Sequence, residues 1–336
     1  MRQVPSRQDA LVGIEAIVAA AKLLHGVATR TPLVPFGRPE ARQFLKAESL
    51  QPIGAFKIRG AYVAVASLSA EQRARGVITY SSGNHAQGVA RAALLLGAPA
   101  VVVMPRGAPA IKAARVAADG AEIVWVGPSS EERQVVAERL AAERGLAVIP
   151  PYDDDRVIAG QGTVGLEIVE DLPDVAAVLV PIGGGGLASG VAVAVKALRP
   201  GARVIGVEPE LAADARDSLA AGRIVAWSSD DVSRTIADGT RTLSLGRRTF
   251  AHLHELLDAV VTVTEAEIAA GVRLAAEESR LVAEPSGALS VAAMAFRAHE
   301  AGLGGLDGPV VAVVSGGNVD AERYREYLDS AIPPRG

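Results

Sequence analysis

A run of four glycines in the segment PIGGGGLASG, residues 181–190, is the clearest sign of a ligand site in the sequence. An apolar stretch typical of a strand precedes it, and an alanine-rich stretch typical of a helix follows it. Glycines allow the backbone to approach an anion closely, and the first turn of a helix adds free N–H groups and the positive end of the helix dipole. The segment has neither the G-x-G-x-x-G spacing of a dinucleotide site nor a G-K-S/T ending. We therefore expect it to bind a phosphate group, with a flexible turn that binds nothing as the alternative.

A single lysine, Lys57, stands among apolar and small residues in ESLQPIGAFKIRGAY, residues 48–62. Arg59 follows two positions later. Burial and a neighbouring cation both lower the pKa of a lysine, and a neutral amine is the form that condenses with an aldehyde. The segment therefore indicates a reactive amine, with a solvated surface lysine as the alternative.

Two further predicted strands end in polar residues, in TYSSGNHAQGVARAA (79–93) and in VVSGGN (313–318). At the start of a helix, the hydroxyl of Ser82, the amide of Asn84 and the backbone N–H groups can hold a carboxylate. Ser82 is equally typical of a simple helix cap. Ser315 either faces a ring atom of a ligand or merely ends its strand.

Strand, glycine turn and helix alternate along most of the chain, which predicts a doubly wound α/β architecture with its sites at the carboxyl ends of the strands. A break near 150–151 and another between 60 and 76 predict a small domain of residues 75–149, inserted into a large cofactor-binding domain of residues 1–74 and 150–336. The runs typical of buried parallel strands are residues 76–82, 98–105, 121–127, 175–184, 202–209 and 308–318, and helical spacing covers residues 86–96, 110–118, 131–143 and 187–198.

Taken together, these motifs resemble the fold type II pyridoxal-phosphate enzymes, specifically the family of serine racemase and serine/threonine dehydratase (threonine ammonia-lyase). The resemblance covers nearly the whole chain. It also takes in VIAGQGTVGLEI (157–168), IGVEPELAAD (205–214), TIADGTRTLSLG (235–246), VVTVTEAEI (260–268) and AEPSGA (283–288). The sequence departs from the family pattern at Ala55, where serine is usual, and at Asp153, where asparagine is frequent.

The resemblance implies an α/β fold of two lobes, each a mostly parallel twisted sheet covered by helices, as in the β chain of tryptophan synthase. It also implies pyridoxal 5'-phosphate as cofactor, carried by Lys57 as a Schiff base. The other residues implied to bind the cofactor are Phe56, Asn84 at the 3'-oxygen, Gly183, Gly184, Gly185, Gly186 and Leu187 at the phosphate, Glu284 near the ring and Ser315 at the pyridine nitrogen.

The reaction implied is α,β-elimination of water and ammonia from L-threonine, L-serine or 3-hydroxyaspartate, which leaves a 2-oxo acid. A serine at position 315 does not hold the ring nitrogen protonated, so the electron sink is weak and rapid loss of a β-leaving group is favoured. Ser82 occupies the position of the second acid–base group of racemases, so amino acid racemase activity stays open. An inert protein that binds pyridoxal phosphate is the alternative from another class.

Two further sites follow from the resemblance. Glu208, the carbonyl of Ala212 and Asp214 match a divalent-cation site, with hard oxygen ligands suited to Mg²⁺, Mn²⁺ or Ca²⁺. A guanidinium near the substrate side chain favours a second carboxylate, which points to 3-hydroxyaspartate. The residues implied to bind the substrate are Ser81, Ser82, Asn84, His85, Arg133 and Arg241.

The composition excludes several other classes of protein. With 34 basic and 38 acidic residues and no strong basic run, nucleic acid is a poor partner, and no segment is apolar enough to predict a membrane span. Without cysteine the chain has no disulfides and no thiolate chemistry. We therefore expect a cytoplasmic catabolic enzyme, a homodimer by the resemblance, without the regulatory domain that brings isoleucine feedback. His252 and His254 are expected on a helix surface.

Overall fold

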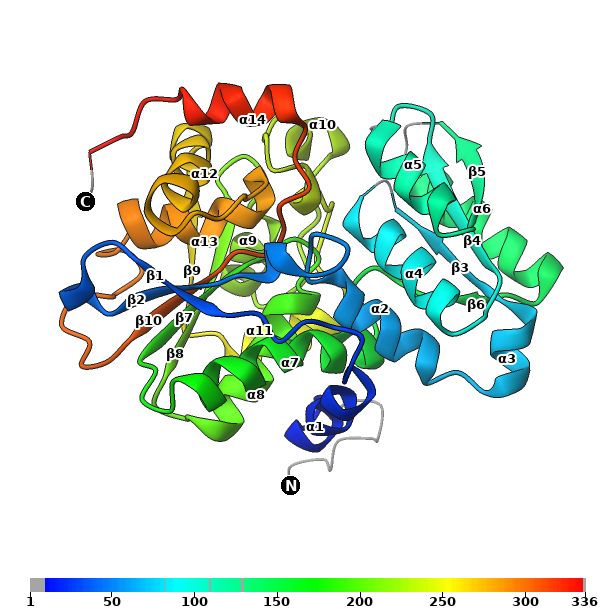
Figure 1. The fold of residues 1–336 in the computed structure, drawn as a ribbon, viewed down its shortest axis with the longest axis horizontal. Helices are drawn as coiled ribbons and strands as arrows, with labels where there is room; N and C mark the ends of the chain where they lie inside the picture. Colours follow the sequence, from blue (N-terminus) through cyan, green and yellow to red (C-terminus); the bar gives the residue numbers. More distant parts are fainter. Residues whose placement is uncertain (1–9, 82, 109, 128–129, 335–336) are drawn as a thin grey trace.

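The protein forms two lobes that lie side by side in a computed structural model, which describes residues 10–81, 83–108, 110–127 and 130–334 (Figure 1). Within these residues, the large lobe contains a six-stranded sheet in the order β1-β2-β10-β7-β8-β9. The bounds of these strands are β1 Leu33–Phe36, β2 Gln43–Lys46, β7 Ala177–Pro181, β8 Arg203–Pro209, β9 Ala259–Val263 and β10 Val310–Val313.

The residues of a strand explain whether it lies inside the large sheet or at its edge. β7 and β10 lie inside the sheet and are buried along their whole length, because parallel strands covered on both faces need continuous apolar runs. β1 pairs antiparallel with β2 at the edge, where Pro35 is tolerated because an edge strand has N–H positions that face no neighbour. β2, β10, β7, β8 and β9 run parallel to one another, so their carboxyl ends share one edge of the sheet.

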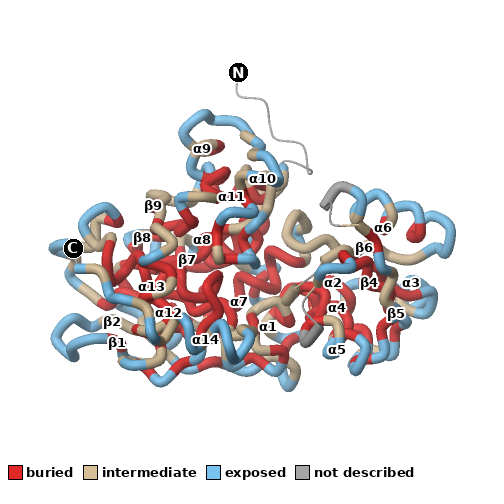
Figure 2. The backbone as a smooth tube through the Cα atoms, turned by 90° about the horizontal axis from the view of Figure 1, so that it is seen from above, coloured by how far each residue is buried: buried red, intermediate tan, exposed pale blue. Residues whose placement is uncertain are grey.

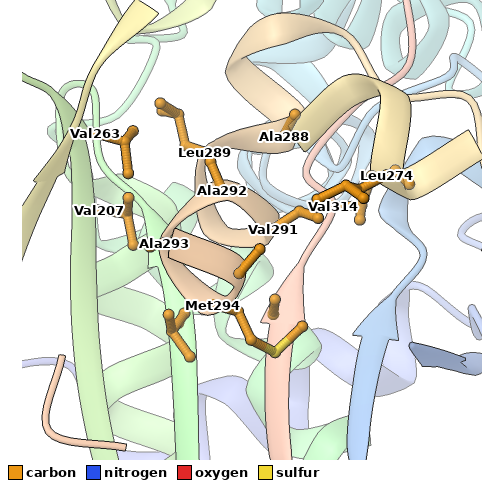
Figure 3. Close-up of a cluster of buried hydrophobic side chains, with 14 of the residues drawn as sticks. Val207, Val263, Leu274, Ala288, Leu289, Val291, Ala292, Ala293, Met294 and Val314 are labelled. Carbon is orange, nitrogen blue, oxygen red and sulfur yellow. The ribbon is translucent and has the colours of Figure 1, made fainter. Parts of the chain in front are cut away.

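Helices cover both faces of the large sheet (Figure 1). α13 (Pro285–Phe296) is buried throughout, because each of its residues is apolar or small. Figure 3 shows its side chains Leu289, Ala293 and Met294 among those of the strands. The other helices of this lobe are α1 Ile14–Leu23, η1 Pro39–Ala41, η2 Glu48–Leu50, α7 Asp155–Asp171, α8 Gly186–Leu198, α9 Asp214–Ala221, α10 Ser229–Val232, η3 Asp238–Thr240, α11 Arg247–Leu256, α12 Glu265–Ser279 and α14 Ala321–Leu328.

The small lobe contains a parallel four-stranded sheet in the order β5-β4-β3-β6 within the described residues. Its central strand β4 (Ala100–Pro105) consists of buried residues only. The remaining elements are β3 Val77–Tyr80, β5 Glu122–Val126, β6 Ala147–Val148, α3 Ala70–Arg75, α4 Asn84–Leu95, α5 Ala110–Ala118 and α6 Ser130–Arg144. Buried residues fill the inner part of each lobe, and the outer turns are exposed (Figure 2).

Helix α2 (Lys57–Ala66) lies between the lobes in both views (Figures 1 and 2). It packs closely against its neighbours because small residues stand at the crossings. A Cβ atom added at Gly160 of α7 would lie 2.7 Å from the carbonyl oxygen of Arg59, and one added at Gly88 of α4 would lie 3.1 Å from that of Lys57. α2 therefore fixes Lys57 at the junction of the lobes.

The predicted α/β fold with two mostly parallel sheets is confirmed. Each of the six predicted strands and four predicted helices overlaps an observed element of that type. The domain bounds 75 and 149 stay a prediction. Among the described residues, no helix combines the length and apolar character of a membrane span.

Candidate active site

A cavity of about 370 Å³ opens between the lobes and is lined by residues of both. From the small lobe come the loop after β3 and residues of α4, α5 and α6. From the large lobe come the glycine turn after β7, the segment after β10 and the loop around η3. The cavity thus lies at the carboxyl ends of β3, β7 and β10, as the α/β architecture predicts.

Lys57, the first residue of α2, presents its amine to this cavity. Its Nζ donates a hydrogen bond of 2.7 Å to the carbonyl oxygen of Pro151 and lies 5.1 Å from the centre of the Phe56 ring. Burial lowers the pKa of this amine to about 8. The expected contribution of a neighbouring cation was wrong, because the Arg59 guanidinium pairs with Glu48 and Glu167 instead.

The glycine run forms the turn between β7 and α8. Its residues line the cavity with backbone atoms, because glycine has no side chain. Gly185 has a left-handed backbone (φ 89°), and a Cβ added there would lie 3.0 Å from side chains of α11 and the preceding loop. A Cβ added at Gly184 would overlap the ring of Tyr152. The turn therefore needs glycine, and it places the first residues of α8 in the cavity wall, where the free N–H groups of a helix start suit a phosphate.

Asn84, Glu284 and Ser315 also line the cavity. The amide of Asn84 donates a 2.5 Å hydrogen bond to Glu284 Oε1 and accepts one of 2.9 Å from Asn318, which fixes its orientation and leaves one N–H. Burial, with the charge of Asp238, raises the pKa of Glu284 to about 7, and its Oε2 has no hydrogen-bond partner among the described residues. Within the described part of the chain, the Ser315 hydroxyl makes one long contact, of 3.5 Å, to the carbonyl oxygen of Ser286.

The turn that begins α4 carries the predicted carboxylate site. Ser81 and His85 line the cavity, whereas Ser82 lies outside the described residues. His85 donates from Nε2 to the carbonyl oxygen of Ile149 at 3.0 Å, so its buried Nδ1 carries a lone pair. Burial and the charge of Lys57 lower the pKa of His85 to about 3, so its ring is neutral.

Cationic side chains stand along the cavity wall. Arg133 and Arg241 line it, and their binding of the substrate stays a prediction. Arg241 directs both Nε and Nη2 to the carbonyl oxygen of Thr235. Sequence reasoning missed Lys112 of α5, which forms an ion pair of 2.8 Å with Asp238 of η3 in the same wall. Nothing in the sequence around Lys112 or Asp238 marks either residue as part of a site. The place of Asp238 in the loop 237–242 is the one feature that could have indicated it.

The three residues of the predicted cation site, Glu208, Ala212 and Asp214, lie together at the end of β8 and the start of α9, outside the cavity wall. Glu208 accepts the N–H groups of Ala215 and Arg216 at 2.9 and 2.8 Å. Burial raises the pKa of both carboxyls, for Asp214 to about 7, and in the described part of the chain neither Asp214 oxygen has a hydrogen-bond partner. Among the described residues, no group of three or more histidine or acidic side chains is arranged so that it could hold a metal ion.

Two other residues singled out from the sequence, His252 and Asp153, lie outside the cavity wall. The expected surface position of His252 was wrong, because the ring is fully buried. Its Nε2 accepts the N–H of Val12 at 2.9 Å and its Nδ1 donates to the carbonyl oxygen of Arg248, so it ties the N-terminal segment to α11. Asp153, where the family often has asparagine, accepts backbone N–H groups at the start of α11, a role that suits a carboxylate.

Comparison with known proteins agrees with this geometry. The profile of the family described as pyridoxal-phosphate dependent enzyme matches residues 25–316. The chain is 45% identical to the L-threo-3-hydroxyaspartate ammonia-lyase of Saccharomyces cerevisiae over 86% of each chain, and 40% identical to that of a Pseudomonas species over 93% of this chain and 97% of the other. Among solved structures, maize serine racemase is similar with a TM-score of 0.87 and 38% identity, over 95% of this chain and 97% of that one.

Proposed function

Because this chain belongs to the family of pyridoxal-phosphate dependent enzymes, we propose that it is a lyase that removes water and ammonia from a small β-hydroxy amino acid. The substrates are 3-hydroxyaspartate, L-threonine or L-serine, and the product is the 2-oxo acid. One observation carries the proposal: a buried amine with a lowered pKa, Lys57, shares a cavity with a glycine turn at a helix start.

The residues of the cavity fit the cofactor. The glycine turn lines the cavity at the start of a helix, where backbone N–H groups suit a phosphate. A Cβ atom at Gly184 or Gly185 would collide with neighbouring side chains, so the turn can form only with glycine. Ser315 and Glu284 Oε2, which has no hydrogen-bond partner in the described ranges, supply polar atoms for the edge of a heteroaromatic ring. When bound, pyridoxal phosphate supplies an aldehyde that condenses with amines and a conjugated ring that accepts electrons from Cα.

The chain's own residues have the following parts in the reaction. Lys57 takes the Cα proton, because a lysine of pKa about 8 is partly neutral at physiological pH and regains the proton readily. Ser81 and the backbone at the start of α4 hold the α-carboxylate, and Asn84 donates its remaining N–H toward the cofactor. The neutral ring of His85 adds no competing charge beside Lys57. The assignment of Ser82 as a second acid–base group stays a prediction.

The test is release of 2-oxo acid from L-serine, L-threonine and both diastereomers of 3-hydroxyaspartate, with product chirality measured in the same samples. Release that disappears in Lys57→Ala supports the proposal and ranks the substrates. Exchange of enantiomers without 2-oxo acid would make the protein a racemase. A protein that binds the cofactor but changes no amino acid would contradict both activities.

We also propose a divalent cation, Mg²⁺, Mn²⁺ or Ca²⁺, at Glu208, the Ala212 carbonyl and Asp214. The buried oxygens of Asp214 support the proposal, because they have no hydrogen-bond partner among the described residues and a bound ion would give them one. Adding Mg²⁺ to protein treated with chelator is expected to raise the melting temperature. Asp214→Asn should abolish that rise, and an equal rise in the variant would contradict the site.

We propose further that the protein works in the cytoplasm as a homodimer. Leu50 and Val282, two large apolar side chains that are about half exposed, are the residues of the large lobe that we assign to the association surface. Light scattering should give a mass near twice the 34.5 kDa of the chain. A monomer at micromolar concentration would contradict the dimer.

A further inference from the structure

Lys112 is a charged residue of the cavity wall for which the proposed reaction has no use. It lies in α5 of the small lobe, with 8% of its side chain exposed. A Cβ atom on Gly83 would lie 3.8 Å from Lys112 Nζ, so the ammonium stands over the turn that begins α4. This turn is where the α-carboxylate is proposed to bind, so Lys112 is within reach of a bound amino acid.

The partner of Lys112 is a carboxylate that belongs to the protein and stands in the substrate cavity. Asp238 Oδ2 lies 2.8 Å from Lys112 Nζ, and 41% of its side chain is exposed. The two members of the pair therefore differ. Moving Asp238 back into water costs little, whereas leaving the buried ammonium without a counter-ion is expensive. A ligand carboxylate that replaces Asp238 would keep Lys112 paired.

The charges around the pair favour such an exchange. Burial lowers the pKa of Lys112, but the carboxylates of Asp238 and Glu284 raise it overall, against the smaller opposing effect of the Arg241 cation. Glu284 is held only partly ionised by burial, with a pKa of about 7. Lys112, Arg241 and Asp238 together therefore carry a net positive charge, which attracts one further anionic group.

We propose that Lys112 binds the side-chain carboxylate of a dicarboxylic substrate in exchange for Asp238, and so sets the preference of the enzyme for that substrate class. This inference rests on the function proposed above. Arg241 is less suited to the task, because Nε and Nη2 of its guanidinium are both directed to the Thr235 carbonyl. A monocarboxylic substrate such as serine leaves the Lys112–Asp238 pair intact, so the residue acts on the ratio between the two classes.

A second interpretation of the pair is purely structural, because it joins the small lobe to the large one. A contact of this kind would affect every substrate alike. Arg115, three residues later on α5, provides the matched control: it is exposed, donates to Asn318 of the large lobe and does not line the cavity. Arg115→Met removes a contact between the lobes but no charge from the wall.

The experiment measures kcat/KM of the holoenzyme for L-threo-3-hydroxyaspartate and L-serine in wild type, Lys112→Met, Asp238→Asn, Arg241→Met and Arg115→Met. Lys112→Met is expected to lower the ratio of hydroxyaspartate to serine by about ten- to a hundredfold, the effect of losing one hydrogen bond to a charged group. Asp238→Asn is expected to raise the ratio several-fold, because the competing carboxylate is gone. Arg115→Met should leave the ratio unchanged.

The proposal is overturned if Lys112→Met lowers both values in proportion, or if Arg241→Met changes the ratio and Lys112→Met does not. If Lys112→Met does not fold, Asp238→Asn decides, and an unchanged or lowered ratio overturns the proposal. If the wild type releases no 2-oxo acid, the proposed function fails on its own. Dissociation constants of L-aspartate and L-alanine, from the cofactor absorption, then test Lys112, whose loss should weaken aspartate selectively.

Discussion

Two charged residues on the first turn of α2, Lys57 and Arg59, are only two positions apart but lie in opposite electrostatic surroundings. Arg59 belongs to a buried ion network, which we define as Lys46, Glu48, Arg59 and Glu167. Its guanidinium makes ion pairs of 2.8 and 2.7 Å with the two glutamates, and Lys46 completes the network at 2.6 Å from Glu167. Lys57 instead faces a cavity, where its amine has one carbonyl partner and no acidic counter-ion among the described residues.

The difference explains what each group does. Burial by itself raises the pKa of Glu48, yet Arg59 and Lys46 lower it overall, so the ion network stays charged and holds α2 to β2 and α7. The charge of Lys57 has no such compensation, and its proton is therefore held weakly. A buried charge with counter-ions stabilises the fold, whereas a buried amine without a counter-ion has a lowered pKa and becomes reactive.

The strongest test of this comparison exchanges the two side chains for neutral ones in turn. Lys57→Ala is expected to lower turnover by at least about a thousandfold, because base and cofactor attachment are lost together. Its free energy of unfolding, measured without cofactor in urea, should stay within about 1 kcal/mol of wild type. A large loss of stability would place Lys57 in the scaffold.

Arg59→Met should have the converse effect. It leaves two carboxylates in the ion network without their main partner, so the free energy of unfolding is expected to fall by about 3–5 kcal/mol. Arg30→Met is the matched control, because Arg30 also pairs with two carboxylates but is 51% exposed. There the loss should be below about 1 kcal/mol. Equal losses in urea titrations would contradict the contrast between buried and exposed pairs.

The cavity side of the comparison is sharpened by Gly184→Ala. The new methyl group would overlap Tyr152, so the turn or the ring must move, and affinity for pyridoxal phosphate is expected to fall about tenfold or more. Gly304→Ala is the control, since nothing lies within 4 Å of a Cβ there. Cofactor titration followed by absorbance measures both. An unchanged affinity in Gly184→Ala would remove the turn from the cofactor site.

The smallest expected effect is on the pH dependence of cofactor attachment. Only the neutral amine attacks an aldehyde, so the rate at which the apo-protein takes up pyridoxal phosphate should rise with pH and level off above about 8, the pKa to which burial lowers Lys57. Free lysine side chains would show the same rise near 10.4. Stopped-flow absorbance measures the profile, and a midpoint near 10 would show that the amine is solvated.

Much of the cofactor site could be predicted because its signals are local. The glycine turn and the polar turn before α4 each consist of consecutive residues between a strand and a helix. Interior strands such as β4 and β7 are continuous apolar runs, which a sequence displays directly. The two-residue strand β6 has no such signal, and β2 contains polar Gln43 and Lys46.

Electrostatic partners could not be predicted in the same way. Lys112 and Asp238 are 126 positions apart, and Arg59 and Glu167 are 108 apart. Sequence proximity even predicted the wrong effect at Lys57, because Arg59 turns away from it toward the ion network. His252 was expected at the surface for the same reason: its partner, Val12, is 240 positions away.

The sequence by itself therefore determined the fold class and the local groups able to hold a phosphate and form an imine, since backbone conformation and apolar patterning depend on neighbours in the chain. Only the tertiary structure decided which charges are paired, which amine loses its proton and which cation faces the substrate. Those properties depend on distances in space and on burial, and the energy of a charge in a protein changes with both far more than with its position in the sequence.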